Sequence, residues 1–64
     1  GKAADIICSG KSALELAQRA ETLGMHGIEW NSDSNYTHID TRDGIWHVRR
    51  HNGSYITVSS FYNY

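Results

Sequence analysis

His38 and Asp40 are the residues of this 64-residue chain whose types and spacing most clearly suggest a functional role. They lie two positions apart in the run 36–42, where polar and less polar residues alternate. Alternation with a period of two is typical of a β-strand. One face of that strand would carry Tyr36, His38, Asp40 and Arg42. The polar side is therefore the face expected to carry the function. A half-exposed strand whose polar side simply faces solvent would show the same pattern.

Asp5 is a further candidate because it is a charged residue inside the apolar run Ala3–Cys8. The run predicts a short, mostly buried strand. Burying an isolated carboxylate is very costly, so we expect Asp5 to be paired, hydrogen-bonded or bound to a cation. The alternative is a position at the wet edge of the strand, with hydrogen bonds from the backbone.

One clear helix is among the elements that would position these residues. Ser12 is a good N-cap residue, and Glu15 three positions later completes a capping box. Small and apolar residues then recur at helical spacing, which predicts a helix from about Ala13 to Leu23. Gly24 supplies the left-handed position that ends many helices. The apolar stripe of this helix is expected to pack on a sheet.

The rest of the chain is predicted to form β-strands. Strands are expected where β-branched and aromatic residues gather, namely at 27–30, 36–42, 45–50 and 55–61. With the first strand and the helix, they predict an α+β fold of order β-α-β-β-β-β. One helix would pack on a small, largely antiparallel sheet. We expect residues 1–64 to form a single domain.

Two dipeptides set the expected pairing of these strands. The Asp-Gly pair at 43–44 favours a two-residue hairpin turn, which would place His47 opposite Asp40 on neighbouring strands. The Asn-Gly pair at 52–53 marks a second turn. There, a three-residue loop with a bulge fits the apolar pattern of the last strand better than a two-residue turn.

The composition excludes some partners and limits how the fold is stabilised. Six basic and seven acidic residues give a net charge of −1. The chain therefore lacks the excess of positive charge that would favour binding to nucleic acid or to an anionic membrane surface. No apolar segment approaches the roughly 20 residues that span a bilayer. The single cysteine, Cys8, excludes an intrachain disulfide. A chain this small is therefore expected to depend on a metal, a partner chain or good packing.

Two motifs in sequence order carry a resemblance to a known family. The first is GKAADI at 1–6, and the second is SNYTHIDTR at 34–42, with the capped helix and Gly27-Ile28 between them. This arrangement resembles the C-terminal half of the zinc-dependent D-alanyl-D-alanine carboxypeptidase and endopeptidase family. The signature of that family is His-x-x-Gly-x-Ala-x-Asp, followed some tens of residues later by a strand with His-x-His or His-x-Asp. These enzymes cut the peptide stems of bacterial peptidoglycan, and phage endolysins also use them.

The resemblance implies a zinc site in which Asp5 and His38 are ligands. It also makes Asp40 the expected partner that orients a ligand or the bound water. Zinc in a hydrolase takes three protein ligands and leaves a place for water. The family's first histidine would lie three residues before Gly1, outside this sequence. The third ligand would then come from His47, expected opposite Asp40, or from a partner chain.

With two of three ligands in the sequence, we expect the chain to bind the cell wall rather than cut it. It would be a peptidoglycan-directed module of a lytic enzyme or endolysin, working outside the cell or at the wall, or released by a phage at lysis. The alternative is part of a zinc metallopeptidase that cleaves a stem-peptide amide bond. By position, Glu29 or Asp33 could then act as the general base.

Aromatic side chains would supply the binding surface of such a module. Flat apolar surfaces for sugar rings could come from Trp30, Tyr36, Trp46, Tyr55 and Tyr62. Packing in the core or on the sheet is the structural alternative for each of them. A third reading is an oligomeric interaction domain, because exposed sheet edges favour association. The expected partners are thus peptidoglycan, a second copy of the chain or a catalytic domain, and neither nucleic acid nor membrane.

Overall fold

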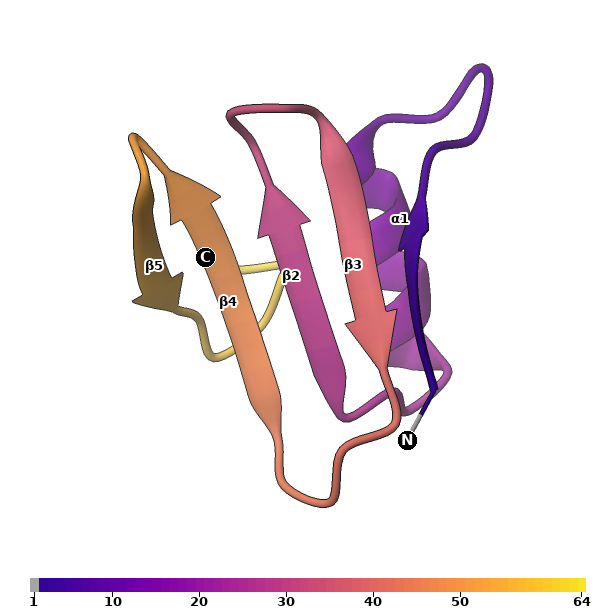
Figure 1. The fold of residues 1–64 in the computed structure, drawn as a ribbon, viewed down its shortest axis with the longest axis vertical. Helices are drawn as coiled ribbons and strands as arrows, with labels where there is room; N and C mark the ends of the chain where they lie inside the picture. Colours follow the sequence, from indigo (N-terminus) through magenta and orange to yellow (C-terminus); the bar gives the residue numbers. More distant parts are fainter. Residues whose placement is uncertain (1) are drawn as a thin grey trace.

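The computed structural model describes residues 2–64 and arranges them as one helix and a five-stranded sheet (Figure 1). The elements in chain order are β1 (Ala3–Ile6), α1 (Ala13–Thr22), β2 (Gly27–Asn31), β3 (Tyr36–Asp40), β4 (Trp46–His51) and β5 (Ser54–Thr57). This confirms the predicted α+β class, with one helix packed on a small, largely antiparallel sheet. None of the helical structure in the described part of the chain is long and apolar enough to cross a membrane.

The helix begins and ends where its capping residues predict. The Ser12 hydroxyl accepts a hydrogen bond from the backbone N–H of Glu15 at 3.1 Å, as expected of a capping box. Gly24 follows the last turn with a φ of +83°, in the left-handed region. The buried residues of α1 are Ala13, Ala17 and Ala20. Their small side chains let the helix lie close to β2 and β3.

The strand order is β1-β3-β2-β4-β5, with β2 parallel to β4 and every other pair antiparallel. The predicted hairpin between segments 36–42 and 45–50 is therefore wrong, because β2 lies between β3 and β4. Residues 41–45 carry the chain across the end of β2 instead of closing a tight turn. All five residues of β2 are buried, as expected for a central strand that is paired on both sides.

The second turn also differs from its prediction. Asn52 and Gly53 have φ values of +51° and +77°, and His51 pairs directly with Ser54 across a two-residue turn. The predicted three-residue loop with a bulge is absent from β4–β5, within residues 2–64. The Asp33 carboxylate accepts hydrogen bonds from the backbone N–H groups of Asn52 and Gly53, at 2.9 and 3.0 Å. These bonds, that from Gly53 foremost, hold the pKa of Asp33 below its usual value.

The sheet has two unlike faces. α1 covers one of them, which we call the helix-side face, and the other, the open face, is the one turned toward the viewer in Figure 1. The core lies on the helix-side face and includes Ile28, Trp30 and Phe61. Phe61 comes from the C-terminal tail, which passes behind β4 and β2. Its backbone N–H donates to Glu21 and its carbonyl accepts from Gln18, which ties the tail to the helix.

The edge strand β1 is more exposed than its sequence predicts. It ends at Ile6, has one neighbouring strand, β3, and is mostly exposed rather than mostly buried. The side chain of Asp5 is 62% exposed. Its carboxylate therefore avoids the cost of full burial. This agrees with the alternative expectation that Asp5 lies at the solvent-exposed edge of its strand.

Candidate functional site

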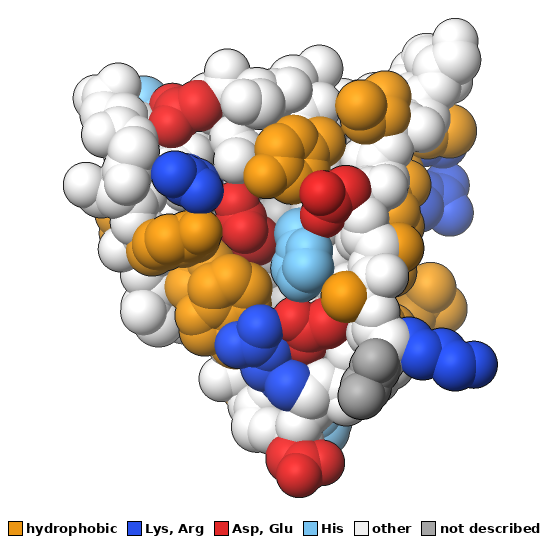
Figure 2. Space-filling model, in the orientation of Figure 1, with side chains coloured by type: hydrophobic (Ala, Val, Ile, Leu, Met, Phe, Trp, Pro, Cys, Tyr) orange, Lys and Arg blue, Asp and Glu red, His pale blue; other side chains and the backbone are white. Residues whose placement is uncertain are grey.

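The open face holds a cluster of acidic side chains around one histidine. In strand register, Asp5 of β1 lies beside His38 of β3, which lies beside Glu29 of β2. Partners in register point to the same face of a sheet, so these three side chains share the open face. The space-filling view of this face shows a histidine near its centre with acidic side chains around it (Figure 2). Residues 33 positions apart in the sequence are thus brought into contact.

Both ring nitrogens of His38 contact carboxylates. Nδ1 lies 2.8 Å from Oδ1 of Asp5, and Nε2 lies 3.1 Å from Oδ2 of Asp40. Burial by itself would lower the pKa of His38, but the hydrogen bonds to Asp5 and Asp40 outweigh it and raise that pKa above its usual value. Two carboxylates thus favour the charged imidazolium and fix the ring in one orientation.

Asp40 is held in place by Arg42 and by the absence of a side chain at Gly27. The Arg42 guanidinium donates to both oxygens of Asp40, at 2.8 and 2.6 Å, and the Arg42 backbone N–H donates at 3.2 Å. The side-chain bonds from Arg42 outweigh burial and hold the pKa of Asp40 far below its usual value. A Cβ added at Gly27 would lie 1.8 Å from Oδ1 of Asp40. The Asp40 carboxylate therefore occupies the space above Gly27.

An aromatic and cationic band continues the open face across β4 and β5. The Arg42 guanidinium carbon lies 4.1 Å from the centroid of the Trp46 ring, and Trp46 lies edge-on to His38 at 6.4 Å. Tyr55 packs against Trp46 with 5.8 Å between ring centroids. Arg50 lies over Tyr55 at 4.9 Å and donates to its hydroxyl. The band thus joins directly onto the His38 cluster.

Three of the predicted aromatic residues lie on the open face together with the His38 cluster: Tyr36, Trp46 and Tyr55. Tyr36 is half-buried and pairs in register with Asn31. The three aromatic residues come from β3, β4 and β5, so they span the width of the face from its centre to the β5 edge. These three members of the predicted aromatic set therefore share one face, and two of them, Trp46 and Tyr55, are in contact.

Three predicted site residues lie on the helix-side face instead. His47 does not face Asp40: its Nε2 lies 3.0 Å from the Met25 carbonyl and its ring packs on Phe61. The predicted position of His47 opposite Asp40, and with it a role there as a catalytic residue or third ligand, is therefore corrected. Gly27 of β2 pairs with Asp40, and Trp46 is the β4 residue that pairs with Gly27. Trp30 is only 8% exposed, in the core, which leaves it no open ring face for a sugar.

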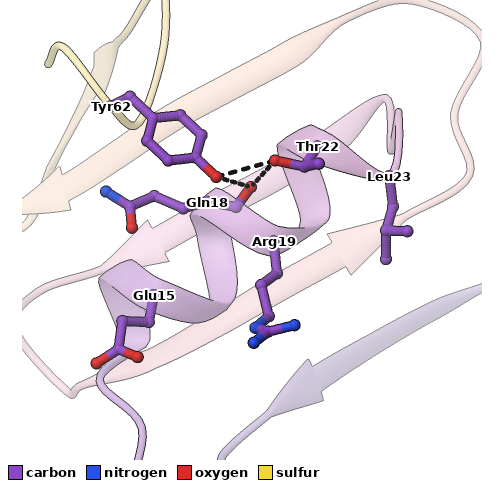
Figure 3. A pocket seen from close by; sticks show the side chains of 6 residues that line it. All are labelled: Glu15, Gln18, Arg19, Thr22, Leu23 and Tyr62. Atoms are coloured by element: carbon purple, nitrogen blue, oxygen red, sulfur yellow. Dashed lines mark hydrogen bonds between the residues drawn. The ribbon is translucent and has the colours of Figure 1, made fainter.

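Tyr62 is the third of these residues, and it leans over the outer surface of α1 (Figure 3). Its hydroxyl lies 2.9 Å from Thr22 Oγ1 and donates to the Gln18 carbonyl at 3.2 Å. The same view shows Arg19 and Leu23 on the same helix, farther from the Tyr62 ring than Gln18 and Thr22. Tyr62 is exposed, but it lies on the opposite side of the sheet from His38.

Arg42 was expected on the polar face but without a role of its own, and Gly27 was not expected at the site. Arg42 had a signal, because it lies two positions after Asp40 and so falls on the polar side of the alternation. No pattern in the sequence could indicate Gly27, because its contact with Asp40 depends on which strand lies beside β2. Of the two possible general bases, Asp33 is engaged in the turn at 52–53, and Glu29 lies beside His38 on the open face.

The contact between Asp5 and His38 can be compared with the separation expected of two ligands of one zinc ion. Two donors of one tetrahedral zinc lie about 3.3 Å apart, given zinc–ligand distances of about 2.0–2.1 Å. The observed distance between Nδ1 and Oδ1 is 2.8 Å, so these two atoms would have to move apart only slightly to bind one ion together. Among residues 2–64, no three His, Cys, Asp or Glu side chains are grouped to hold one metal. Of the ligands that the family resemblance implies, residues 2–64 thus bring Asp5 and His38 into contact and group no third one with them.

Comparison with protein-family models, with curated proteins and with solved structures returned no match. The family resemblance therefore rests on the motifs at 1–6 and 34–42 alone. A function for the chain has to be inferred from those motifs together with the geometry of the open face.

Proposed function

We propose that this chain is a peptidoglycan-directed domain that binds the bacterial cell wall through its open face. One observation carries the proposal: the His38 cluster and the band of Trp46 and Tyr55 form one continuous surface. The contacts that join them are Arg42 with Asp40 on one side and Arg42 with Trp46 on the other. The motifs at 1–6 and 34–42, which carry the family resemblance, contribute Asp5 and His38 to that same surface.

The chemistry of this surface suits a polymer of sugars and short peptides. Aromatic rings such as Tyr55 offer apolar area against which sugar rings stack. Arg50 and Arg42 can recognise peptide carboxylates, since the guanidinium group matches a carboxylate in shape and charge. The acidic cluster around His38 suits groups of the opposite charge. A ligand with both charges and flat rings would therefore use the whole width of the face.

Sedimentation with purified sacculi tests this proposal. The full chain should co-sediment with the sacculi, and the supernatant should contain no released stem peptide. Co-sedimentation with released peptide would favour the hydrolase below. A chain that stays in solution with intact sacculi would overturn the proposal. Cellulose serves as the control polymer, because it has sugar rings without peptide stems.

The second candidate is the zinc-binding half of a peptidoglycan peptidase, and the contact between Asp5 and His38 favours it. In that case these two residues hold the ion, while Asp40 fixes the ring of His38 through Nε2. When bound, zinc lowers the pKa of a water ligand and polarises the amide to be cut. Glu29, beside His38 on the open face, is the carboxylate placed to accept a proton from that water.

Thermal unfolding with added zinc tests this candidate without an activity assay. Zinc that binds the folded chain should raise the unfolding midpoint, by an amount that grows with zinc concentration. Asp5→Asn should remove most of the shift, because the amide is a poor zinc ligand. Asp43→Asn is the matched control, since Asp43 is exposed in the loop between β3 and β4. An equal shift in both variants, or none in the natural chain, would rule the candidate out.

A further inference from the structure

Glu29 is a buried carboxylate on the open face, and its charge lacks a partner among residues 2–64. The residue is 6% exposed, and within residues 2–64 the one hydrogen bond to its carboxylate is donated by Asn31 to Oε2 at 3.1 Å. No Lys, Arg or His nitrogen of the described residues forms an ion pair with it. A largely buried carboxylate without a counter-charge is costly, and proteins normally pair such groups.

The two neighbouring carboxylates differ from Glu29 in this respect. Asp5 is paired with His38, and Asp40 is paired with both His38 and Arg42. Both ring nitrogens of His38 are engaged by these two residues, so the imidazolium has no N–H left to donate to Glu29. Glu29 is therefore the one carboxylate of this cluster whose charge is left without a contact partner in the described chain.

The free oxygen of Glu29 faces the surface. Every fully buried side-chain nitrogen or oxygen in the described residues has a hydrogen-bond partner. Oε1 of Glu29 has none among residues 2–64, so it is not completely buried, and the register with His38 and Val48 places it on the open face. A small cationic group from solvent would contact this oxygen in an environment that contains other carboxylates and is partly shielded from water.

We propose that Glu29 is the recognition point for a primary ammonium group of the ligand. The ammonium would donate to Oε1 of Glu29, while Asn31 keeps its bond to Oε2. This inference rests on the proposed function and narrows it: the peptide stem that binds carries a diamino residue with a free amine. A stem in which that amine is blocked or cross-linked lacks the charge that Glu29 requires.

Sacculi with free and with acetylated amines test the inference directly. Acetylation removes the positive charge and leaves the rest of the polymer in place. The natural chain should bind acetylated sacculi about tenfold more weakly, a loss typical of one charge-assisted hydrogen bond. Glu29→Gln should bind untreated sacculi as weakly as the natural chain binds acetylated ones. Acetylation should then change the binding of Glu29→Gln less than twofold.

Glu15→Gln is the matched control, because it makes the same chemical change on the exposed surface of α1. It should bind both kinds of sacculi like the natural chain. Equal binding of the natural chain to both kinds would overturn the role of Glu29 and leave wall binding intact. The same conclusion follows if acetylation weakens Glu29→Gln and the natural chain equally. No binding of the natural chain to either kind would overturn the proposed function itself, and the role of Glu29 with it.

Discussion

The two faces of this sheet are built from alternate residues of the same strands, yet they differ in packing and in the partners of their polar groups. On the helix-side face, Thr37 is fully buried and its hydroxyl donates to the Ala13 carbonyl at 2.6 Å. On the open face, the next residue, His38, sits among carboxylates at the surface. Polar groups of the first face bond to the fold itself, whereas those of the second bond mainly to one another. The packed core thus lies behind the sheet, and the surface proposed to bind the ligand lies in front of it.

The largest expected effect is on the helix-side face, at Phe61. This residue is 0% exposed and joins the tail to the core. Phe61→Ala should destabilise the fold by about 3–5 kcal/mol, because it loses apolar burial and leaves a cavity. Urea unfolding measures the loss, and Phe61→Leu should cost clearly less. A loss below about 1 kcal/mol for Phe61→Ala would mean that the tail is not part of the core.

Gly27 is the position where the open face should be most sensitive to added volume. An alanine there would overlap the Asp40 carboxylate, so Gly27→Ala should cost about 1–3 kcal/mol and shift Asp40 away from His38. Gly44→Ala is the control, because nothing lies within 4 Å of a Cβ at that position. In an Asp40→Ala background the cost of Gly27→Ala should fall, which a double-mutant cycle by urea unfolding would measure. Equal costs in the two backgrounds would contradict the overlap.

The smallest expected effect on stability is the pH dependence at His38. Its pKa is raised in the folded chain, so the stabilisation from its charge is full below the unfolded pKa of about 6.5 and is lost as pH rises through the folded pKa. The natural chain should therefore lose stability relative to His38→Gln between pH 6 and pH 8.5. The difference should be no more than about 1 kcal/mol, because Asp5 is largely exposed. Urea unfolding at the two pH values would show it, and a difference of opposite sign would contradict the pairing.

Local patterns in the sequence predicted the elements and, for β3, the two faces of the strand. The capping residues Ser12 and Glu15 mark the start of α1, and the alternation in β3 places His38 and Asp40 together, with Thr37 on the other side. These features depend on residues close in sequence, which is why a period and a cap suffice to find them.

The order of the strands could not be predicted in the same way. Alternation decides which face a side chain takes, but it does not decide which strand lies beside it. The Asp-Gly signal at 43–44 favoured a hairpin, whereas the fold inserts β2 between β3 and β4 and buries it completely. This choice moved His47 to the helix-side face and brought Trp46 to the open one. It also made Gly27 a neighbour of Asp40, which no local pattern could indicate.

The most direct test of the central claim compares two exposed tyrosines on opposite sides of the sheet. Tyr55 on the open face is 55% exposed, and Tyr62 over α1 is 61% exposed, so both can be replaced at little cost to the core. Sacculus binding should fall about tenfold or more in Tyr55→Ala, as expected for the loss of one aromatic ring that stacks on the ligand, and should be unchanged in Tyr62→Ala. Loss of binding in Tyr62→Ala with full binding in Tyr55→Ala would contradict the claim that the open face is where this protein meets its ligand.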